Sequence, residues 1–377
     1  MMIALTERGR KALDLIGDGG VHHKLTISSS KEKVFMTFHS DEAYALLQPH
    51  FQRRVRRNEP LARHSALHVG GPADLWVTLE STQELTSLVN TCAEKHYPLL
   101  ITGNSSNIIY SDHGVRGIVA HIATQSYIID AQGNEALLVA EAGVNWPHLV
   151  YVLAEQGWGG LEFGVNIPGT LGGSVVSNAG SHNEDIGQRL LWLEVLDARG
   201  SNIGGEETIA IPLIHRYEHA ELDLSYRHSR FRLRRHANIT QDGQFVPSDR
   251  GMIEPGEIIL RLALTLSRDT PQHLSQQIKA YKAQQRPQPE ILQRQAGPLF
   301  KDPTGCDAGY LIEEAGLQGL RIGQVQLVPY DANYIMNLGS ASAWEVIALL
   351  ATVHQEVLKR LNVDLQLDIE FQGDKGS

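Results

Sequence analysis

The sequence predicts an α+β protein with more than one domain, and three observations favour this fold class. The chain has 377 residues, which is too long for one ordinary core and corresponds to roughly two or three domains of about 100–200 residues. Short strand patterns and glycine turns follow one another from Leu67 onward, without the regular alternation of parallel βαβ units. Beyond Ser267 the pattern becomes helical and then rich in proline and glutamine, so we place a domain boundary near residue 268.

The composition is that of a soluble globular protein, with 42% apolar and 20% charged residues. A net charge of −10 argues against a nucleic-acid partner. Cys92 and Cys306 are too far apart for a metal-binding motif, and so few thiols fit a reducing compartment. The N-terminus lacks the apolar segment of a signal peptide, and no apolar stretch is long enough to cross a membrane. We therefore expect a cytoplasmic protein with no membrane partner, acting as a monomer.

Residues 1–60 are interpreted as an N-terminal extension that ends in a basic linker at 51–60. Two basic clusters, Arg53–Arg57 and Arg230–Arg235, are interpreted as solvated surface rather than as phosphate sites. The elements expected after the extension are a helix at Thr82–Lys95, strands at Tyr97–Thr102, Leu190–Leu196 and Glu257–Leu266, a turn at Ala198–Ser201, and a helix at Pro271–Gln285.

The C-terminal part of the sequence predicts a packed helix followed by a strand. The helix begins at a capping box formed by Ser342 and Glu345 and carries an apolar face as far as Leu361. Residues 363–371 then alternate strictly between apolar and polar side chains, which predicts one strand. Asp368 and Glu370 belong to the polar face of that strand, which faces either solvent or a site.

The run Leu161–Gly180 places many glycines among small and apolar residues with hardly a charge. Glycine of that density indicates backbone lying against a ligand, because a residue without a Cβ lets main-chain N–H groups approach a phosphate or a flat ring. The alternative is a mobile surface loop, although such loops are usually richer in Ser, Asp, Lys and Pro.

A second loop, Gly103–Asn107, follows a predicted strand and offers backbone N–H groups and two hydroxyls at one point, which suits a pyrophosphate. A plain turn would explain its Gly and Asn residues equally well. The nucleotide-binding patterns G-x-G-x-x-G and G-x-x-x-x-G-K-[ST] are missing from the sequence, which argues against a Rossmann or P-loop protein.

The chain resembles the UDP-N-acetylenolpyruvoylglucosamine reductase (MurB) family in several segments, in the same order and at comparable spacing: HVGGPADLWV (68–77), GNSSNIIYSD (103–112), EAGVNW (141–146), GLEFGVNIPGTLGGSVVSNAG (160–180), SYRHS (225–229), AGPLFKDP (296–303), AGYLIEEAGLQGLRIG (308–323) and LDIEFQG (367–373). The match runs from about residue 60 to residue 373. It is specific because independent motifs agree in their order.

The resemblance implies a flavoenzyme. Its FAD-binding domain, at 61–268, would be of the PCMH or vanillyl-alcohol-oxidase type with two α+β subdomains, and a smaller α+β substrate domain would follow at 269–377. The strand at 257–266 runs straight into the next helix, as in the shorter subtype without an extra substrate-covering loop. The residues implied to bind FAD are Gly103, Asn104, Ser105, Ser106, Asn107, Ile167, Pro168, Gly169, Thr170, Gly172, Gly173 and Asn178.

The family reaction reduces the enolpyruvyl ether of UDP-N-acetylglucosamine to UDP-N-acetylmuramate for peptidoglycan synthesis. NADPH first reduces the flavin, whose N5 then delivers hydride to the vinyl CH2 carbon. Negative charge develops on the substrate carboxylate, which calls for positive or hydrogen-bonding groups aimed there. Arg227 matches the family arginine in this role, although its sequence context alone indicates only a basic loop. Glu370 matches a family glutamate that acts in its protonated form, which requires a raised pKa.

The sequence also departs from the family. Pro298 stands where the family has a serine, sometimes a cysteine, that supplies the final proton, and proline has neither a hydroxyl nor an N–H. The alternative donors are an ordered water, Thr304, Cys306 or His182. Further departures are His68 for arginine, Ser105 for glycine, Ser181-His182-Asn183 for Ala-Tyr-Gly, Asp302 for asparagine and Asp331 for histidine.

Three functional hypotheses follow from the resemblance and the departures. The first is the reductase itself, with another proton donor. The second is an FAD-binding relative that has lost the reduction and acts as a binding or regulatory module. The third is a different PCMH-type flavin oxidoreductase, against which the retention of Arg227 and Glu370 argues.

Overall fold

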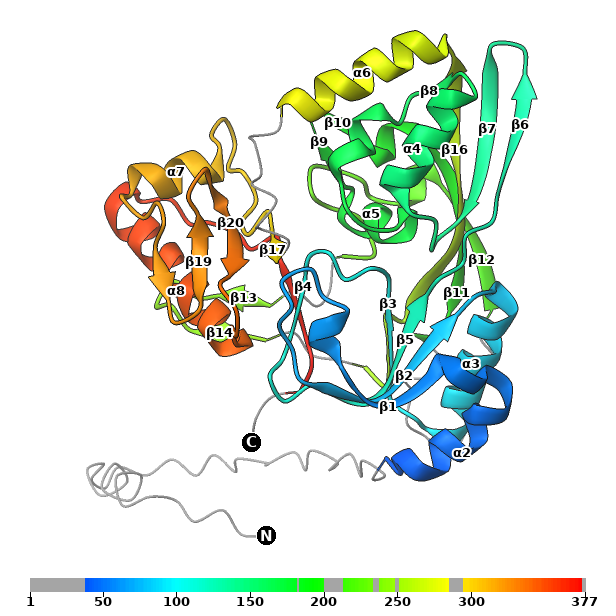
Figure 1. Ribbon diagram of the computed structural model, residues 1–377, viewed down its shortest axis with the longest axis horizontal. Coiled ribbons are helices and arrows are strands. Elements are labelled where there is room, and N and C mark those ends of the chain that lie inside the picture. Colours follow the sequence, from blue (N-terminus) through cyan, green and yellow to red (C-terminus); the bar gives the residue numbers. More distant parts are fainter. Residues whose placement is uncertain are drawn as a thin grey trace, which may run out of the picture. The chain divides into compact units, whose positions relative to one another are not determined.

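The computed structural model describes residues 38–181, 183–199, 213–232, 237–247, 251–284 and 294–374. Most of the described strands belong to three sheets of five, six and four strands, each packed against helices (Figure 1). The predicted α+β class is confirmed. Within the described ranges no helix combines the length and the apolar character that crossing a bilayer would require.

The first sheet has the order β1-β2-β5-β3-β15. Its strands are β1 (Val55–Pro60), β2 (Pro72–Leu79), β5 (Val115–Ile122), β3 (Leu99–Thr102) and β15 (Ile253–Glu254). Helices α2 (Ser40–Phe51) and α3 (Thr82–Lys95) share its core. Helix α3 begins where predicted because the Ser81 side chain accepts a hydrogen bond from the Glu84 N–H.

The segment interpreted as a basic linker, 51–60, is part of this first core. Strand β1 pairs antiparallel with β2, and Phe51 and Val55 are buried with Ala43 and Leu47 of α2. The linker prediction is therefore wrong, because the arginines of this segment lie between apolar residues that reach the sheet. Residues 40–60 belong to the same core as the elements that follow them.

The second sheet is antiparallel, with the order β12-β11-β16-β7-β6, and β8 also pairs with β16. Its strands are β12 (Leu213–Glu218), β11 (Leu190–Asp197), β16 (Glu257–Arg268), β7 (Glu135–Glu141), β6 (Tyr127–Gln132) and β8 (Trp158–Gly159). The helices in its core are α4 (Trp146–Glu155), the 3-10 helices η3 (Glu162–Asn166) and η4 (Ile186–Arg189), α5 (Leu171–Ser177) and α6 (Pro271–Gln284).

Helix α6 lies beside α4 (Figure 1) and packs against both α4 and η3. Its residues Leu274 and Ile278 are buried in the second core. The predicted boundary near residue 268 precedes this helix, whereas the core changes only after it. The division of the chain into domains at 60 and 268 otherwise stays a prediction.

The third sheet is antiparallel, with the order β17-β20-β19-β18. Its strands are β17 (Gln295–Ala296), β20 (Asp331–Asn337), β19 (Val325–Val328) and β18 (Arg321–Ile322), and its helices are α7 (Ala308–Glu314) and α8 (Ala343–Leu361). The predicted capping box of α8 is present at Ser342 and Glu345. The apolar face of α8, from Val346 to Val357, lies in this core.

The strand predicted at 363–371 forms only in part. Strand β21 (Glu370–Gln372) pairs in parallel with β4 (Ile108–Tyr110), which follows the Gly103–Asn107 loop. The alternation holds for Leu365 and Leu367, but Asp368 is 2% exposed instead of lying on a solvated face. The remaining short strands are β9 (Gly180–Ser181), β10 (Glu184–Asp185), β13 (Asn238–Ile239) and β14 (Phe245–Val246).

Candidate functional site

A cavity of about 930 Å³ is lined by residues from strands of all three sheets and from the loops between them. The Gly103–Asn107 loop and the segment Asn166–Thr170 form part of its wall, together with residues near Pro298 and β21. Every residue predicted to bind the cofactor lies on this wall except Gly172. Arg227, Pro298 and Glu370 lie on it as well, so the structure brings the predicted site residues together.

The two glycine-rich segments contact each other. A Cβ on Gly103 would lie 2.7 Å from Thr170 Oγ1, which leaves room only for glycine. The Ser106 hydroxyl donates a hydrogen bond of 2.9 Å to the Pro168 carbonyl. Gly169 has a φ of +135°, and a Cβ there would lie 3.2 Å from Ser106 Oγ. The segments therefore form one continuous backbone surface on the cavity wall.

Gly172 has a packing role. A Cβ on Gly172 would lie 2.7 Å from the Cβ of Ala142, on the side of α5 that packs on the second core. Its predicted contact with the cofactor has no support in the structure. Gly173 does line the cavity, and its N–H donates to Thr170 Oγ1, which caps α5.

The side chains of Ser105 and Asn178 are engaged within the protein. The Ser105 hydroxyl lies 2.9 Å from Thr102 Oγ1 and 2.7 Å from the Tyr110 hydroxyl, and all three side chains are buried. Asn178 donates to the Ser225 carbonyl at 2.8 Å and accepts from the Gly187 N–H at 3.0 Å. Ser105 therefore does not offer its hydroxyl to a pyrophosphate, and Asn178 fixes the segment that carries Arg227.

Ser105 has a φ of +50°, in the left-handed region that favours glycine. This backbone conformation gives a physical reason why a glycine is common at the matching place in the family. The serine compensates for the strain with the two hydroxyl contacts described above.

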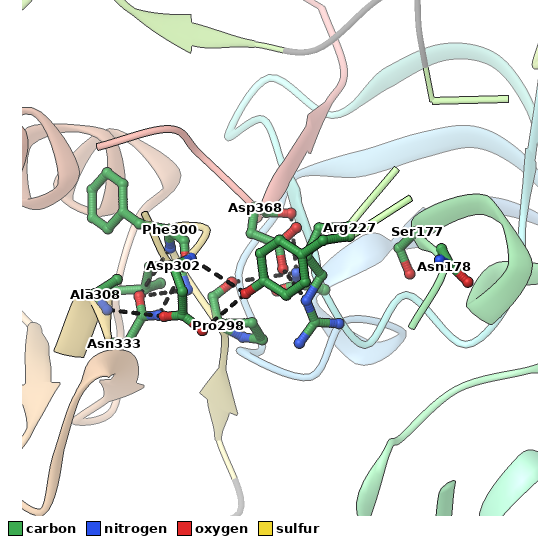
Figure 2. A network of polar contacts seen from close by, with 12 residues as sticks. Ser177, Asn178, Arg227, Pro298, Phe300, Asp302, Ala308, Asn333 and Asp368 are labelled. Atoms are coloured by element: carbon green, nitrogen blue, oxygen red, sulfur yellow. Dashed lines mark hydrogen bonds and ion pairs between the residues drawn. The ribbon is translucent and has the colours of Figure 1, made fainter. Parts of the chain in front are cut away.

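Arg227 and Glu370 come from distant segments but line the same cavity. The Arg227 side chain is 18% exposed, and its Nε lies 3.6 Å from Asp368 Oδ2. Figure 2 shows Arg227 beside Asp368, with Pro298 on one side and the Ser177–Asn178 end of α5 on the other. Asp368 thus connects the segment of Arg227 to that of Glu370.

Arg232 belongs to a cluster interpreted as solvated surface, and for this residue the interpretation is wrong. Arg232 is 4% exposed. Its Nη1 donates to Asp368 Oδ1 at 2.6 Å and to the Arg227 carbonyl at 3.2 Å, and its Nη2 donates to the Asp368 carbonyl. In the other cluster, Arg54 pairs with Glu84, Arg56 with Glu59 and Arg57 with Asp41.

Burial raises the pKa of Glu370, and the nearby carboxylates of Asp368 and Glu254 act in the same direction. The guanidinium of Arg232 and the ammonium of Lys301 act in the opposite direction but do not cancel the effect. Burial and the two guanidinium groups of Arg232 and Arg227 also lower the pKa of Lys301. The raised pKa agrees with the protonated form expected for Glu370.

Pro298 lies on the wall within a tightly held segment. Asn107 Nδ2 donates to the Pro298 carbonyl at 3.4 Å and to the Asp368 carbonyl at 3.2 Å. Asn333 accepts from the N–H groups of Leu299 and Phe300 and donates to the Phe300 carbonyl (Figure 2). Two of the alternative proton donors, Thr304 and Cys306, do not line the cavity. The third, His182, lies outside the described residues.

Sequence reasoning did not single out Tyr226 and Tyr334. The Tyr226 hydroxyl donates to Asp302 Oδ2 at 2.9 Å and accepts from the Asp302 N–H at 3.3 Å, so it joins the segment of Arg227 to that of Pro298. Burial raises the pKa of Tyr334, which also lines the cavity, to about 12. Two of the departures from the family sequence bear on these tyrosines. Asp302 is hydrogen-bonded to Tyr226, and the charge of Asp331 contributes to the raised pKa of Tyr334.

Residues 73–203 match the sequence profile of an FAD binding domain. Together with the fold and this cavity, the match defines an FAD-binding protein. Residues 288–372 match the profile of the C-terminal domain of UDP-N-acetylenolpyruvoylglucosamine reductase. The chain is 34% identical over 318 residues to the UDP-N-acetylenolpyruvoylglucosamine reductase of Rubrobacter xylanophilus, which covers 84% of this chain and 95% of the relative. The chain belongs to the UDP-N-acetylenolpyruvoylglucosamine reductase family.

Two further relatives agree with this assignment. The enzyme of that name from Moorella thermoacetica is 33% identical over 328 residues, covering 87% of this chain and 96% of the relative. The crystal structure of UDP-N-acetylenolpyruvylglucosamine reductase (MurB) from Thermus caldophilus is similar, with a TM-score of 0.63 and 29% identity. The similarity covers 84% of this chain and 98% of that chain.

Proposed function

We propose that the protein reduces UDP-N-acetylenolpyruvoylglucosamine to UDP-N-acetylmuramate, with FAD as its prosthetic group and NADPH as its reductant. One observation carries this proposal. Arg227 and Glu370, which match the reacting residues of the family, face the same cavity as the two contacting glycine-rich segments. The match with the relatives named as this reductase covers 95% and 96% of their own length.

The residues around the cavity fit an FAD molecule. The volume of about 930 Å³ lies at the upper end of the range of about 300–1,000 Å³ that is usual for ligand sites. Gly103 and Gly169 let the backbone of the two segments approach a flat or anionic group. Asn107 Oδ1 is buried on this wall and has no hydrogen-bond partner among the described residues, so it can accept from a ligand N–H.

We assign FAD binding to the described wall residues of the two segments, and to Ser105 and Asn178 through their backbone only. When bound, FAD would supply hydride transfer between NADPH and the methylene carbon of the substrate. The protein must then stabilise negative charge on the neighbouring carbon and on the carboxylate.

Arg227 meets the first requirement of this chemistry. Its planar guanidinium can hold a carboxylate through two parallel hydrogen bonds. Its backbone lies in the left-handed region, with a φ of +52°, and its position is fixed on one side by Asn178, through Ser225, and on the other by Asp368. The Arg227 side chain therefore loses little conformational entropy when it binds the substrate.

Glu370 meets the second requirement. A carboxyl group that stays protonated in a buried site can donate a hydrogen bond to the developing enolate oxygen. Burial and two neighbouring carboxylates raise its pKa in this way. The same arrangement would disfavour an ionised Glu370 beside an anionic substrate.

The proton that completes the reduction must come from a group other than residue 298. Thr304 and Cys306 are not on the cavity wall. An ordered water is therefore the donor that we propose. General acids contribute about 10²–10⁴-fold, so its use in place of the serine is compatible with turnover.

The test is anaerobic oxidation of NADPH by the purified flavoprotein, followed by absorbance with and without UDP-N-acetylenolpyruvoylglucosamine. Oxidation in molar excess over the flavin, only when the substrate is present, is the expected result. Reduction of the flavin without turnover of the substrate would show that the second half of the reaction has been lost. An apoprotein that binds no flavin would refute the proposal altogether.

A further inference from the structure

A buried pair of charges, Arg232 and Asp368, lies in the cavity wall beside Arg227 and Glu370. Asp368 is 2% exposed and Arg232 is 4% exposed. Burying such charges is costly unless each is paired and hydrogen-bonded. A pair of this kind next to a cavity therefore needs an explanation beyond fold stability, because apolar residues of similar size would stabilise a core as well.

Arg232 is held rigidly by its terminal nitrogens. Nη1 donates to Asp368 Oδ1 at 2.6 Å and Nη2 donates to the Asp368 carbonyl. This leaves Nε, which is buried and donates no hydrogen bond within the described ranges. Nε lies 3.5 Å from Glu370 Oε1, so its N–H is next to the carboxyl group of Glu370.

Asp368 divides its two oxygens between the two arginines. Oδ1 accepts from Arg232 at 2.6 Å, and Oδ2 lies 3.6 Å from Arg227 Nε. The contact with Asp368 is made through Nε of Arg227, and the Nη groups of Arg227 can form the fork to a carboxylate. Asp368 therefore contacts Arg227 through Nε and holds Arg232 through both of its terminal nitrogens.

Resting on the proposed function, we propose that Asp368 and Arg232 are positioning residues for the reduction. Asp368 orients the guanidinium of Arg227 toward the carboxylate of the substrate. Arg232 holds Asp368 in place and sets the charge state of Glu370. Neither residue contacts the reacting atoms, because Asp368 acts through Arg227 and Arg232 acts through Asp368 and Glu370.

The charged groups that face Glu370 are Arg232, Asp368, Glu254 and Lys301. Removing the positive charge of Arg232 takes away a group that favours ionised Glu370, whereas removing the negative charge of Asp368 takes away a group that disfavours it. The two substitutions should therefore move the titration of Glu370 in opposite directions. A pair that only stabilised the fold would have no such effect.

The test uses the FAD-loaded protein with the substitutions Arg232→Gln and Asp368→Asn and with both together. The carboxyl signal of Glu370 in protein carrying ¹³C-labelled glutamate, assigned by its absence in Glu370→Gln, is titrated by NMR. We expect its midpoint to rise in Arg232→Gln, to fall in Asp368→Asn and to lie between them in the double variant. We also expect Asp368→Asn to bind UDP-N-acetylmuramate roughly tenfold more weakly, because Arg227 loses its orienting partner.

Arg54→Gln is the matched control, since Arg54 makes a bidentate pair with Glu84, at 2.7 and 2.6 Å, away from the cavity wall. It should leave both readouts unchanged. If a single variant fails to fold, Arg232→Lys keeps the charge and should keep the midpoint near that of the unaltered protein. Midpoints that do not move, or that move in the same direction, would overturn the inference. A protein that fails to turn over the substrate refutes the proposed function, while the titration still decides this inference.

Discussion

Replacing Asn333 with alanine would remove the hydrogen bonds that hold the Pro298 segment in the cavity wall. Phe300 lies opposite Leu367 in an antiparallel bridge whose hydrogen bonds are made by the neighbouring residues, Lys301 to Gln366 and Asp368 to Leu299. The N–H and carbonyl of Phe300 are therefore left to the Asn333 side chain, at 2.9 Å each.

The cost can be worked out from these contacts. The Leu299 N–H keeps a partner, because it also donates to the Asn333 main-chain carbonyl at 2.9 Å. Two buried groups of Phe300 lose theirs, and each costs about 1–3 kcal/mol. The expected loss of unfolding free energy is ~4 kcal/mol, which corresponds to a fall in melting temperature of ~10 °C for a domain of this size.

The assay is thermal unfolding followed by calorimetry on the FAD-loaded protein, together with the rate of substrate-dependent NADPH oxidation. We expect Asn333→Ala to lower both. Asn134→Ala is the control, since Asn134 is exposed in the turn between β6 and β7, and changes at such sites stay within about 0.5 kcal/mol. A change in melting temperature of Asn333→Ala as small as that of the control would refute the reasoning.

Three further substitutions test the loops and one ion pair. Gly169→Ala should weaken FAD binding ~10-fold, because residue 169 has a φ of +135° and backbone strain costs about 1–3 kcal/mol. The flavin-to-protein absorbance ratio of the purified variant measures this loss. The control is Gly133→Ala, which is also at positive φ but in open space and should keep its flavin. Ser105→Ala should lower the melting temperature by a few degrees without loss of flavin, since its hydroxyl contacts Thr102 and Tyr110; flavin loss would contradict this. The hydrogen bond from Arg54 holds the pKa of Glu84 below its usual range, so its stabilisation is present above the unfolded pKa of about 4.3 and is lost as the pH falls through the folded value. Melting temperatures of Glu84→Gln should accordingly differ from those of the unaltered protein near neutral pH and converge in acid, and a constant difference would argue against the pair.

The helices of this fold could be predicted from the sequence because their signals are local. Ser81 and Glu84 begin α3, and Ser342 and Glu345 begin α8, each within one helical turn. The glycine-rich segments could be predicted for a related reason. A close approach of backbone to backbone, as at Gly103, excludes every side chain and leaves glycine in the sequence.

The partners of buried charges could not be predicted in this way. Arg232 and Asp368 are separated by 136 residues, and no local pattern distinguishes a paired arginine from a solvated one. The alternation at 363–371 likewise indicates which residues share a face, but not that the Asp368 N–H leaves the regular ladder to donate to Leu299. The sequence indicated Arg227 and Glu370, which we propose as the reacting residues, whereas the pairing of Arg232 with Asp368 depends on the tertiary structure.

The parallel pairing of β21 with β4 has a consequence for the biosynthesis of the protein. Strand β4 directly follows the Gly103–Asn107 loop, and the Glu370 N–H donates to the Asn107 carbonyl at 3.0 Å. Because residues 370–372 leave the ribosome after all the other described strands, the nascent chain can form its first two sheets and expose both glycine-rich segments before the pocket has its final wall. Flavin that binds during translation would enter a pocket that still lacks the wall formed by β21. Messenger RNAs truncated before codon 368 would yield proteins that keep both glycine-rich segments but lack Asp368 and Glu370.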